Sequence, residues 1–275
     1  MTFRTRFAPS PTGPLHLGHA CSALIAHDMA RAAHGTFLLR IEDIDQTRAR
    51  PEWEAQIYDD LAWLGLVWPV PVMHQSDRMA AYDAALDTLW ARGLLFPCTC
   101  TRRDIQQAMS APQEGVSQTG PDGPIYPGTC RPDSTDERKR ITARPRPRDA
   151  ALRLDMAQAL ACLQLASAGF TETGSGPCGE TGAIAITPTN LIEETGDIVL
   201  ARRDMQTSYH LSVVVDDAAQ DITHVIRGQD LFDATRIHVL LQALLDLPTP
   251  TYHHHRLIRA DTGKRLATRD EARAI

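Results

Sequence analysis

The chain has 275 residues, of which 43% are apolar and 23% are charged, a balance that excludes an intrinsically disordered chain. Its net charge of −6 is not that of a protein covered in basic residues for nucleic acid, although a local basic patch is compatible with it. No stretch approaches the roughly 18 apolar residues of a membrane span, and the opening MTFRTRFAPS lacks an apolar signal region. We therefore expect a cytoplasmic protein that does not associate with membranes.

The first forty residues have the pattern of a strand, a turn, a helix and a second strand. Residues 3–7 alternate Phe and Thr with Arg, which predicts a half-buried strand, and the three prolines within residues 9–14 exclude both helix and strand. Apolar residues then recur at helical spacing from 18 to 35, and a short apolar run follows at 37–41. This order is typical of a parallel sheet, so we predict an α/β fold with a Rossmann-like, doubly wound sheet.

Two amphipathic helices follow before the pattern weakens. One is predicted at 51–65, and Ser76 is placed to cap a second helix that ends at Gly93. Residues 110–149 are rich in Gly, Pro, Ser and charge and have no apolar period, which predicts an inserted loop region. Residues 150–192 are rich in Ala and Gly and allow no structural prediction.

Regular patterns return after residue 196. Short apolar runs at 198–200, 211–215 and 225–226 predict strands, and 231–245 predicts an amphipathic helix. We interpret the residues from Thr249 onward as a polar tail. The sheet is therefore predicted in two halves with an insertion between them.

The spacing of three of the six cysteines indicates metal binding. Cys98 and Cys100 are two residues apart, and Cys130 follows at a distance. In a chain without secretory features this spacing does not indicate a disulfide framework. Three thiolates and one oxygen or nitrogen donor complete a tetrahedral zinc site, which would hold together a region that lacks its own apolar core. The alternative is a set of buried free thiols.

The segment between the first predicted strand and helix has the features of a phosphate-binding site. A helix N-terminus offers unpaired N–H groups and the positive end of the helix dipole. Gly18 allows the backbone to approach a nucleotide closely, and His16 and His19 can donate hydrogen bonds to phosphate oxygens. Taken alone, two histidines three residues apart are equally consistent with ordinary surface or capping residues.

Five motifs, in this order, carry a family resemblance: RFAPSPTGPLHLGHA at 6–20, RIEDID at 40–45, YHLSVVVDD at 209–217, VIRGQDL at 225–231 and GKRLATRD at 263–270. They resemble the catalytic domain of the class I glutamyl-tRNA synthetases. More narrowly, the chain is similar to the glutamyl-queuosine tRNA(Asp) synthetases, stand-alone paralogues that lack an anticodon-binding domain. The length favours these paralogues, although a truncated glutamyl-tRNA synthetase would have the same length.

The resemblance implies a glutamate site formed by five residues. Arg6 and Arg227 can each fork a carboxylate, and Glu42 can accept hydrogen bonds from the ammonium group. Ser10 and Tyr209 can add hydroxyl hydrogen bonds. All five lie at ends of predicted strands, where open α/β sheets bind ligands. Singly, each charged residue is as consistent with an ordinary surface charge.

The resemblance also implies how metal and ATP are held. In the paralogues a tyrosine joins three cysteines as a zinc ligand, and here Tyr126 stands at that position with Cys98, Cys100 and Cys130. The last motif corresponds to the loop that clamps the ATP phosphates. The implied ATP-binding residues are His16, Gly18, His19, Lys264 and Thr268, and the implied catalytic residues are His16, His19, Lys264, Arg265 and Arg269.

Thr268 departs from the family pattern, because a lysine occupies its position in the family. A hydroxyl cannot neutralise phosphate charge, and loss of such a charge costs about 10²–10³ in rate. Lys264, Arg265 or Arg269 can substitute for it.

The implied protein is an aminoacyl-tRNA-synthetase-like ligase, a monomer with one structural Zn²⁺. It would use ATP with Mg²⁺ to activate L-glutamate without tRNA, then transfer the glutamyl group to the queuosine base in the anticodon of tRNA(Asp). Two alternatives remain open, an ordinary glutamyl-tRNA synthetase catalytic fragment and a catalytically silent tRNA- or nucleotide-binding paralogue. The implied segments are a first half of the catalytic domain at 1–95, a zinc-binding and connective insertion at 96–194, a second half at 195–248 and the signature-loop region at 249–275.

Overall fold

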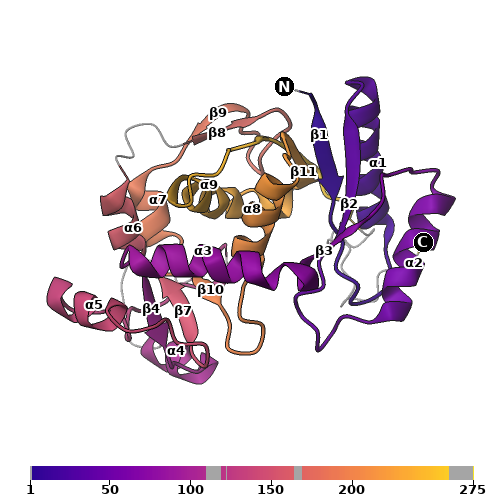
Figure 1. Cartoon of the computed structure of the whole chain (residues 1–275). Coiled ribbons are helices and arrows are strands. Elements are labelled where there is room, and N and C mark those ends of the chain that lie inside the picture. The colour runs from indigo at the N-terminus through magenta and orange to yellow at the C-terminus, as the bar shows by residue number, and fades with distance from the viewer. Residues whose placement is uncertain (1, 110–118, 122, 164–168, 260–274) are drawn as a thin grey trace.

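A computed structural model describes residues 2–109, 119–121, 123–163, 169–259 and 275 (Figure 1). Four residues of the predicted phosphate-clamping loop therefore lie outside the described residues: Lys264, Arg265, Thr268 and Arg269.

A parallel sheet carries the site. Its strands are β1 (Arg4–Phe7), β2 (Thr36–Ile41), β3 (Met73–His74), β11 (His224–Gly228) and β12 (Thr251–His255). They pair in the orders β1-β2-β3 and β11-β12, all parallel. The backbone N–H of Thr223 donates to the carbonyl of Arg4 at 3.0 Å, so β11 begins beside β1. The predicted α/β fold with a parallel sheet is confirmed, and the strand order reverses between β1 and β11, where such sheets form a crevice at their carboxyl ends.

Two further strands extend this sheet from the region that allowed no prediction. Strand β8 (Gly169–Glu172) pairs with β12 in parallel and with β9 (Gly182–Ala185) in antiparallel orientation. Glu172, the last residue of β8, pairs with Tyr252 of β12. A stretch without a readable pattern thus contributes to the same sheet as the predicted site residues.

The helices pack against the sheet and form two separate hydrophobic cores with it (Figure 1). One core packs α1 (Leu17–Ala32) and α2 (Pro51–Trp63) with β1 and β2. Helix α1 buries four alanines, whose small side chains allow a close approach to the strands. The other core contains α3 (Met79–Ala91), α8 (Tyr209–Ala219) and α9 (Ala234–Leu244).

A second, antiparallel sheet has the strand order β10-β7-β4. These strands are β4 (Leu95–Cys98), β7 (Ala151–Leu154) and β10 (Val199–Ala201). The remaining elements are α4 (Arg102–Met109), β5 (Thr119–Gly120), β6 (Gly123–Pro124), α5 (Thr135–Thr142), α6 (Met156–Cys162), α7 (Pro188–Glu193) and the 3₁₀ helices Gln75–Arg78 and Gln229–Leu231.

Three local predictions are wrong. Residues 211–215, predicted as a strand, lie in α8, which Ser208 caps by accepting a hydrogen bond from the Leu211 backbone. Because this helix is buried on most sides, its β-branched run shows no helical period. The predicted polar tail after Thr249 begins with the buried strand β12. Ser76 does not cap α3, since its hydroxyl donates to Asp43 at 2.6 Å.

Candidate active site

A cavity of about 350 Å³ lies at the carboxyl ends of β1, β2 and β11. Seven of the predicted site residues line it: Arg6, His16, Gly18, His19, Glu42, Tyr209 and Arg227. They come from distant parts of the chain and share one cavity because the strands that carry or precede most of them are parallel and end at the same edge of the sheet.

Four charged side chains that alternate in sign lie on one side of the cavity, and two of them, Arg6 and Glu42, line it. The Arg6 guanidinium forks Asp217, with Nε at 2.9 Å from Oδ1 and Nη2 at 3.2 Å from Oδ2. Arg40 donates to Asp217 Oδ1 at 2.7 Å and to Glu42 Oε1 at 3.0 Å. We call Arg6, Arg40, Glu42 and Asp217 the paired wall, because its two cations and two anions cancel. No side chain or backbone group among the described residues accepts a hydrogen bond from the Nη1 group of Arg6, which is therefore available to a ligand.

The two carboxyl groups of the paired wall respond differently to burial. Burial alone would raise the pKa of Asp217, but the guanidinium groups of Arg6 and Arg40 hold it below its ordinary value. Burial raises the pKa of Glu42, and Arg40 and Arg6 offset this only in part. A further cation at the cavity would therefore stabilise the ionised form of Glu42 more than that of Asp217.

Arg227, on β11, forms another wall of the cavity and has only neutral partners. Its Nε donates to His254 Nε2 at 3.1 Å and its Nη1 to His238 Nδ1 at 3.0 Å. Its Nη2 donates to Thr235 Oγ1 at 2.7 Å and to the Leu231 carbonyl at 3.2 Å. Arg227 is only 6% exposed, and within the described part of the chain no carboxylate contacts it. Four of its five N–H groups are used, so one Nη1–H and an unneutralised charge face the cavity.

Two histidines cap α1 at the cavity. His16 Nδ1 accepts from the Gly18 backbone at 3.1 Å, and His19 Nδ1 accepts from the His16 backbone at 3.2 Å. In a neutral imidazole the proton then resides on Nε2. Burial lowers the pKa of both rings, that of His19 to about 4, so both are neutral near pH 7. They can offer Nε2–H donors to a phosphate but no positive charge.

Gly18 is required by the close approach of these rings. A Cβ at position 18 would lie 2.9 Å from His16 Cε1, and the stacked His16 and His19 rings have centroids 3.8 Å apart. Any side chain here would displace the His16 ring from its capping position.

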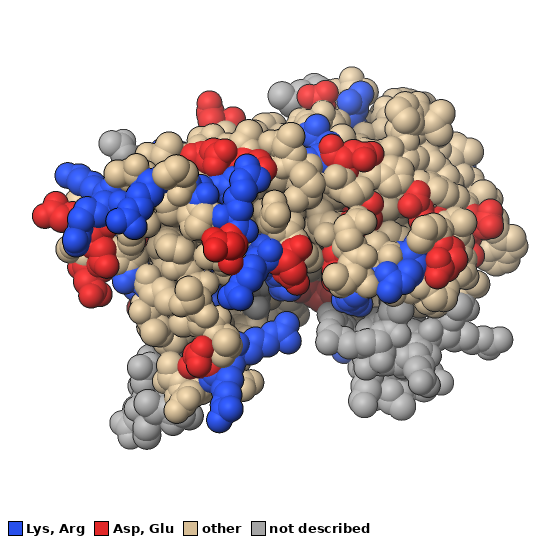
Figure 2. Space-filling model, turned by 60° about the horizontal axis from the view of Figure 1, so that its bottom comes forward, with Lys and Arg blue, Asp and Glu red and all other residues tan. Residues whose placement is uncertain are grey.

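A groove of about 800 Å³ meets the cavity at Glu42 and Tyr209, and Ser10 lines the groove and not the cavity. Four exposed arginines line the groove: Arg48, Arg102, Arg202 and Arg203. Within the described ranges none of the four forms an ion pair. Figure 2 shows basic side chains along the middle of one face of the molecule, with acidic side chains among them. Glu42, Asp45, Asp197 and Asp204 also line the groove, so its available positive charge lies on these four arginines.

Three cysteines and a tyrosine meet at the end of β4. The Tyr126 Oη lies 3.5 Å from the Sγ atoms of Cys98 and Cys100, and Cys100 Sγ lies 3.5 Å from Cys130 Sγ. The three sulfur atoms lie within 4.8 Å of one another. Tetrahedral zinc would separate sulfur and oxygen ligands by about 3.5 Å and two sulfurs by about 3.8 Å, given bonds of about 2.3 and 2.0 Å. The donor set therefore fits zinc.

The similarity to known proteins covers nearly the whole chain. A family model for the class I tRNA synthetases (E and Q), catalytic domain, matches residues 2–275. A Rhodobacter capsulatus protein named glutamyl-Q tRNA(Asp) synthetase is 60% identical over 275 residues, which cover 98% of this chain and 92% of that protein. The chain belongs to the glutamyl-Q tRNA(Asp) synthetase family of class I synthetases. A Thiobacillus denitrificans protein of the same name is 39% identical over 98% of this chain and 79% of its own.

Solved structures agree with this family. The crystal structure of a glutamate tRNA ligase from Elizabethkingia meningosepticum in complex with its amino acid superposes with a TM-score of 0.73 at 27% identity. The alignment covers 98% of this chain and 52% of that enzyme, so the glutamyl-Q family member spans about half the length of the solved ligase. No helix in the described ranges is long and apolar enough to cross a membrane.

Several residues that build the site were missed in the sequence. Asp217 stands inside a quoted motif, but the interpretation of 211–215 as a strand concealed its place in α8 beside Arg6. Thr235 and His238 are three residues apart on α9 and contact Arg227 from one helix face. No sequence signal distinguishes them from other residues of a buried helix.

Proposed function

We propose that this protein activates L-glutamate with ATP and transfers the glutamyl group to the queuosine base in the anticodon of tRNA(Asp). The observation that carries the first step is the buried Arg227 cation, which faces the cavity with no carboxylate partner among the described residues. Glutamate carries two carboxylates and one ammonium group, a net charge of −1. The paired wall is already neutral, so one bound glutamate would neutralise Arg227.

In this proposal each group of glutamate has a partner on the cavity wall. One carboxylate receives the free Nη1–H of Arg227, and the Nη1 group of Arg6 serves the other. The ammonium group donates to Glu42, whose ionised form it stabilises. Ser10 and Tyr209 supply hydroxyl groups where the cavity meets the groove.

Activation would proceed by direct attack of the glutamate α-carboxylate on the α-phosphorus of ATP. A carboxylate–phosphorus bond forms, the bond to pyrophosphate breaks, and no side chain becomes covalently attached. The protein would contribute position and hydrogen bonds, with His16 and His19 donating Nε2–H to phosphate oxygens next to Gly18. Mg²⁺ bound by the ATP phosphates supplies positive charge. We assign the phosphate-clamping role to Lys264, Arg265, Thr268 and Arg269.

The second step needs RNA beside the amino acid, and the four exposed arginines of the groove support it. The groove meets the cavity at Glu42 and Tyr209, so an anticodon loop in the groove would bring its base to the activated carboxyl group. The names of the relatives support queuosine in tRNA(Asp) over a tRNA 3′ end. In this proposal 1–95 and 195–248 are the two halves of the catalytic domain, 96–194 is the connective insertion and 249–275 the loop region, and the last two segments each add strands to the catalytic sheet.

Pyrophosphate exchange with L-glutamate and ATP, without tRNA, tests the first step. We expect exchange that depends on glutamate, and its absence with Mg²⁺ and Zn²⁺ supplied would favour a silent binding paralogue. Transfer to tRNA(Asp) whose 3′-terminal adenosine has been removed tests the second step, because this truncation leaves the queuosine ring hydroxyls intact. Labelled glutamate should still be attached to such tRNA. Attachment that requires the intact 3′ end would instead identify an ordinary glutamyl-tRNA synthetase.

We also propose that Cys98, Cys100, Tyr126 and Cys130 hold one structural Zn²⁺, which would fix the loop between β4 and α5. Cys100→Ser should remove most of the zinc and lower the melting temperature. Cys162→Ser is the matched control, because Cys162 is exposed and outside the cluster. Elemental analysis should find about one zinc per chain in the wild type and in the control. Equal zinc in Cys100→Ser would contradict the proposed ligand set.

A double variant that removes two positive charges from the groove tests its role in tRNA binding. The double variant Arg202→Ala/Arg203→Ala should raise the KM for tRNA several-fold and reduce its salt dependence, because phosphate contacts are lost. Glutamate-dependent exchange should not change. Arg31→Ala, on an exposed part of α1 outside the groove, is the control. An unchanged KM for tRNA would remove the groove from the proposal.

A further inference from the structure

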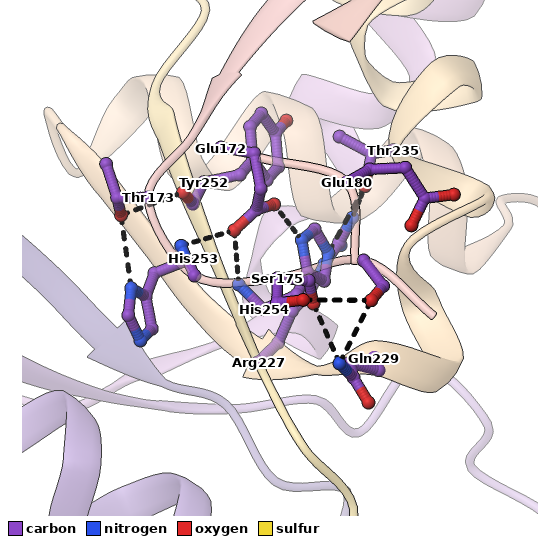
Figure 3. A network of polar contacts seen from close by, with 12 residues as sticks. Glu172, Thr173, Ser175, Glu180, Arg227, Gln229, Thr235, Tyr252, His253 and His254 are labelled. Carbon is purple, nitrogen blue, oxygen red and sulfur yellow. Dashed lines mark hydrogen bonds and ion pairs between the residues drawn. The ribbon is translucent and has the colours of Figure 1, made fainter. Parts of the chain in front are cut away.

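A buried acid–base pair lies directly behind Arg227 (Figure 3). The side chains of Glu172 on β8 and His254 on β12 are both 0% exposed. Neither belongs to the lining of the cavity. Glu172 comes from the stretch that allowed no prediction, and His254 from the stretch interpreted as a polar tail.

Glu172 is an acceptor for three donors. Its Oε1 accepts from the backbone N–H of Gly174 at 2.7 Å and of His254 at 2.9 Å. Its Oε2 lies 2.5 Å from His254 Nδ1. A buried carboxylate with three such partners is well satisfied as an anion. Its position therefore requires a proton on His254 Nδ1.

The other imidazole nitrogen faces Arg227. Arg227 Nε carries a hydrogen and cannot accept, so His254 Nε2, 3.1 Å away, must present its lone pair. Burial and the nearby Arg227 charge lower the pKa of His254 to about 4, which keeps the ring neutral with a single proton. With that proton on Nδ1 both hydrogen bonds form, and the Thr235 hydroxyl, 3.3 Å away, can also donate to Nε2. With the proton on Nε2 the N–H groups of His254 and Arg227 would oppose each other.

We propose that Glu172 is a positioning residue for amino-acid recognition: it fixes the Nδ1–H tautomer of His254 and so provides the acceptor that orients the Arg227 guanidinium toward the cavity. The inference rests on the proposed glutamate-binding role of Arg227. Glu172 lies outside the five family motifs of the sequence, on strand β8, which contributes no residue to the cavity lining. Glu172 contacts His254 and not Arg227, so the cavity side of the guanidinium stays open to a ligand carboxylate.

Glu172→Gln tests the inference because the amide has one donor end. If its NH₂ group faced the two backbone N–H groups, donors would meet donors, so it must face His254 Nδ1. His254 would then carry its proton on Nε2, opposite Arg227 Nε. We expect the KM for glutamate to rise about tenfold, with the KM for ATP and the kcat at saturating glutamate near wild type.

Two readouts separate positioning from a general loss of structure. Long-range ¹H–¹⁵N spectra should show the His254 proton on Nδ1 in the wild type and on Nε2 in Glu172→Gln. Glu180→Gln is the matched control, because Glu180 accepts from the Cys178 backbone in the same region and has no contact with His254. The control should keep the wild-type tautomer and the wild-type KM for glutamate.

A second pair of variants serves if Glu172→Gln does not fold. His254→Gln places an amide oxygen near the position of Nε2 and keeps an acceptor for Arg227, whereas His254→Asn replaces only the Nδ1 donor. We expect the smaller rise in the KM for glutamate in His254→Gln. An equal or smaller rise in His254→Asn would overturn the inference.

The inference and the proposed function fail in different ways. If Glu172→Gln changes neither the tautomer nor the KM for glutamate, the positioning role is wrong while glutamate activation stands. If the wild type shows no glutamate-dependent exchange, the proposed function fails, and the tautomer spectra still show whether Glu172 controls His254.

Discussion

The two walls of the cavity hold their arginines in opposite ways. On the paired wall, Arg6 is forked by Asp217, and Arg40 joins Asp217 to Glu42, so the folded chain itself satisfies the charges. On the other wall, Arg227 is held by two imidazoles, a hydroxyl and a carbonyl, all neutral. Both arrangements fix a guanidinium, but only the second leaves its charge available.

The difference indicates a division of labour. Ion pairs that are buried must be complete, since loss of one partner leaves an isolated charge, so the paired wall is coupled to folding. Neutral acceptors position a cation without neutralising it, so the Arg227 wall is coupled to ligand binding. Variants on the first wall should therefore affect stability most, and variants on the second should affect affinity for glutamate most.

The largest expected effect is on activity. Arg227→Met removes charge-assisted hydrogen bonds worth about 1.5–3 kcal/mol each, so we expect kcat/KM for glutamate to fall by roughly 10²–10³-fold. Arg236→Met is the control, because Arg236 pairs with Glu194 and Asp233 outside the cavity. Glutamate-dependent pyrophosphate exchange measures both variants. A loss in the control equal to that in Arg227→Met would remove the contrast between the walls.

The next effect is on stability. Asp217→Asn leaves Arg6 and Arg40 without their shared anion, which costs about 3–5 kcal/mol and lowers the melting temperature by on the order of 10 °C. Asp221→Asn removes only an exposed ion pair with Arg4, worth on the order of 0.5 kcal/mol. It should change the melting temperature by about a degree or two at most. Thermal unfolding followed by circular dichroism checks both.

This stability difference should depend on pH in a defined direction. The pKa of Asp217 lies below its ordinary value, so its contribution is present above the unfolded pKa of about 3.9. The contribution is lost as the pH falls through the lower folded pKa. The gap between wild type and Asp217→Asn should hold between about pH 5 and pH 8 and close below about pH 4. A gap that opened as the pH fell would contradict the pairing.

The smallest effect sharpens the comparison on the neutral wall. Thr235→Val keeps the shape but removes one of the four acceptors of Arg227, while the Leu231 carbonyl still serves Nη2. We expect the KM for glutamate to rise about fivefold, for a loss of about 1 kcal/mol. Thr88→Val, at an exposed hydroxyl on α3, is the control. No change in Thr235→Val would mean that the remaining acceptors suffice to orient Arg227.

Much of the cavity could be predicted from the sequence because of strand polarity. Arg6 lies in β1, Glu42 directly follows β2, and Arg227 lies in β11. Parallel strands bring their carboxyl ends to one edge, so residues far apart in the chain were expected together. The shared cavity confirms this expectation of proximity.

The supporting residues could not be predicted, because their pairing depends on elements without a readable period. Asp217 reaches Arg6 only because 209–219 is a helix, which its buried β-branched run concealed. Glu172 and His254 meet across β8 and β12, where hydrogen bonds satisfy buried polar side chains. These two strands have no alternation of apolar and polar residues to predict that burial. Sequence patterns report apolar burial, and a buried polar network leaves no such trace.

The discrimination between L-glutamate and L-glutamine tests most directly whether the charge of Arg227 awaits a carboxylate. The two amino acids have nearly the same shape, but only glutamate brings the net negative charge. In pyrophosphate exchange we predict that the wild type prefers glutamate by about 10² or more in kcat/KM and that Arg227→Met loses most of this preference. Full retention of the preference in Arg227→Met would contradict the assignment of that charge to the bound amino acid.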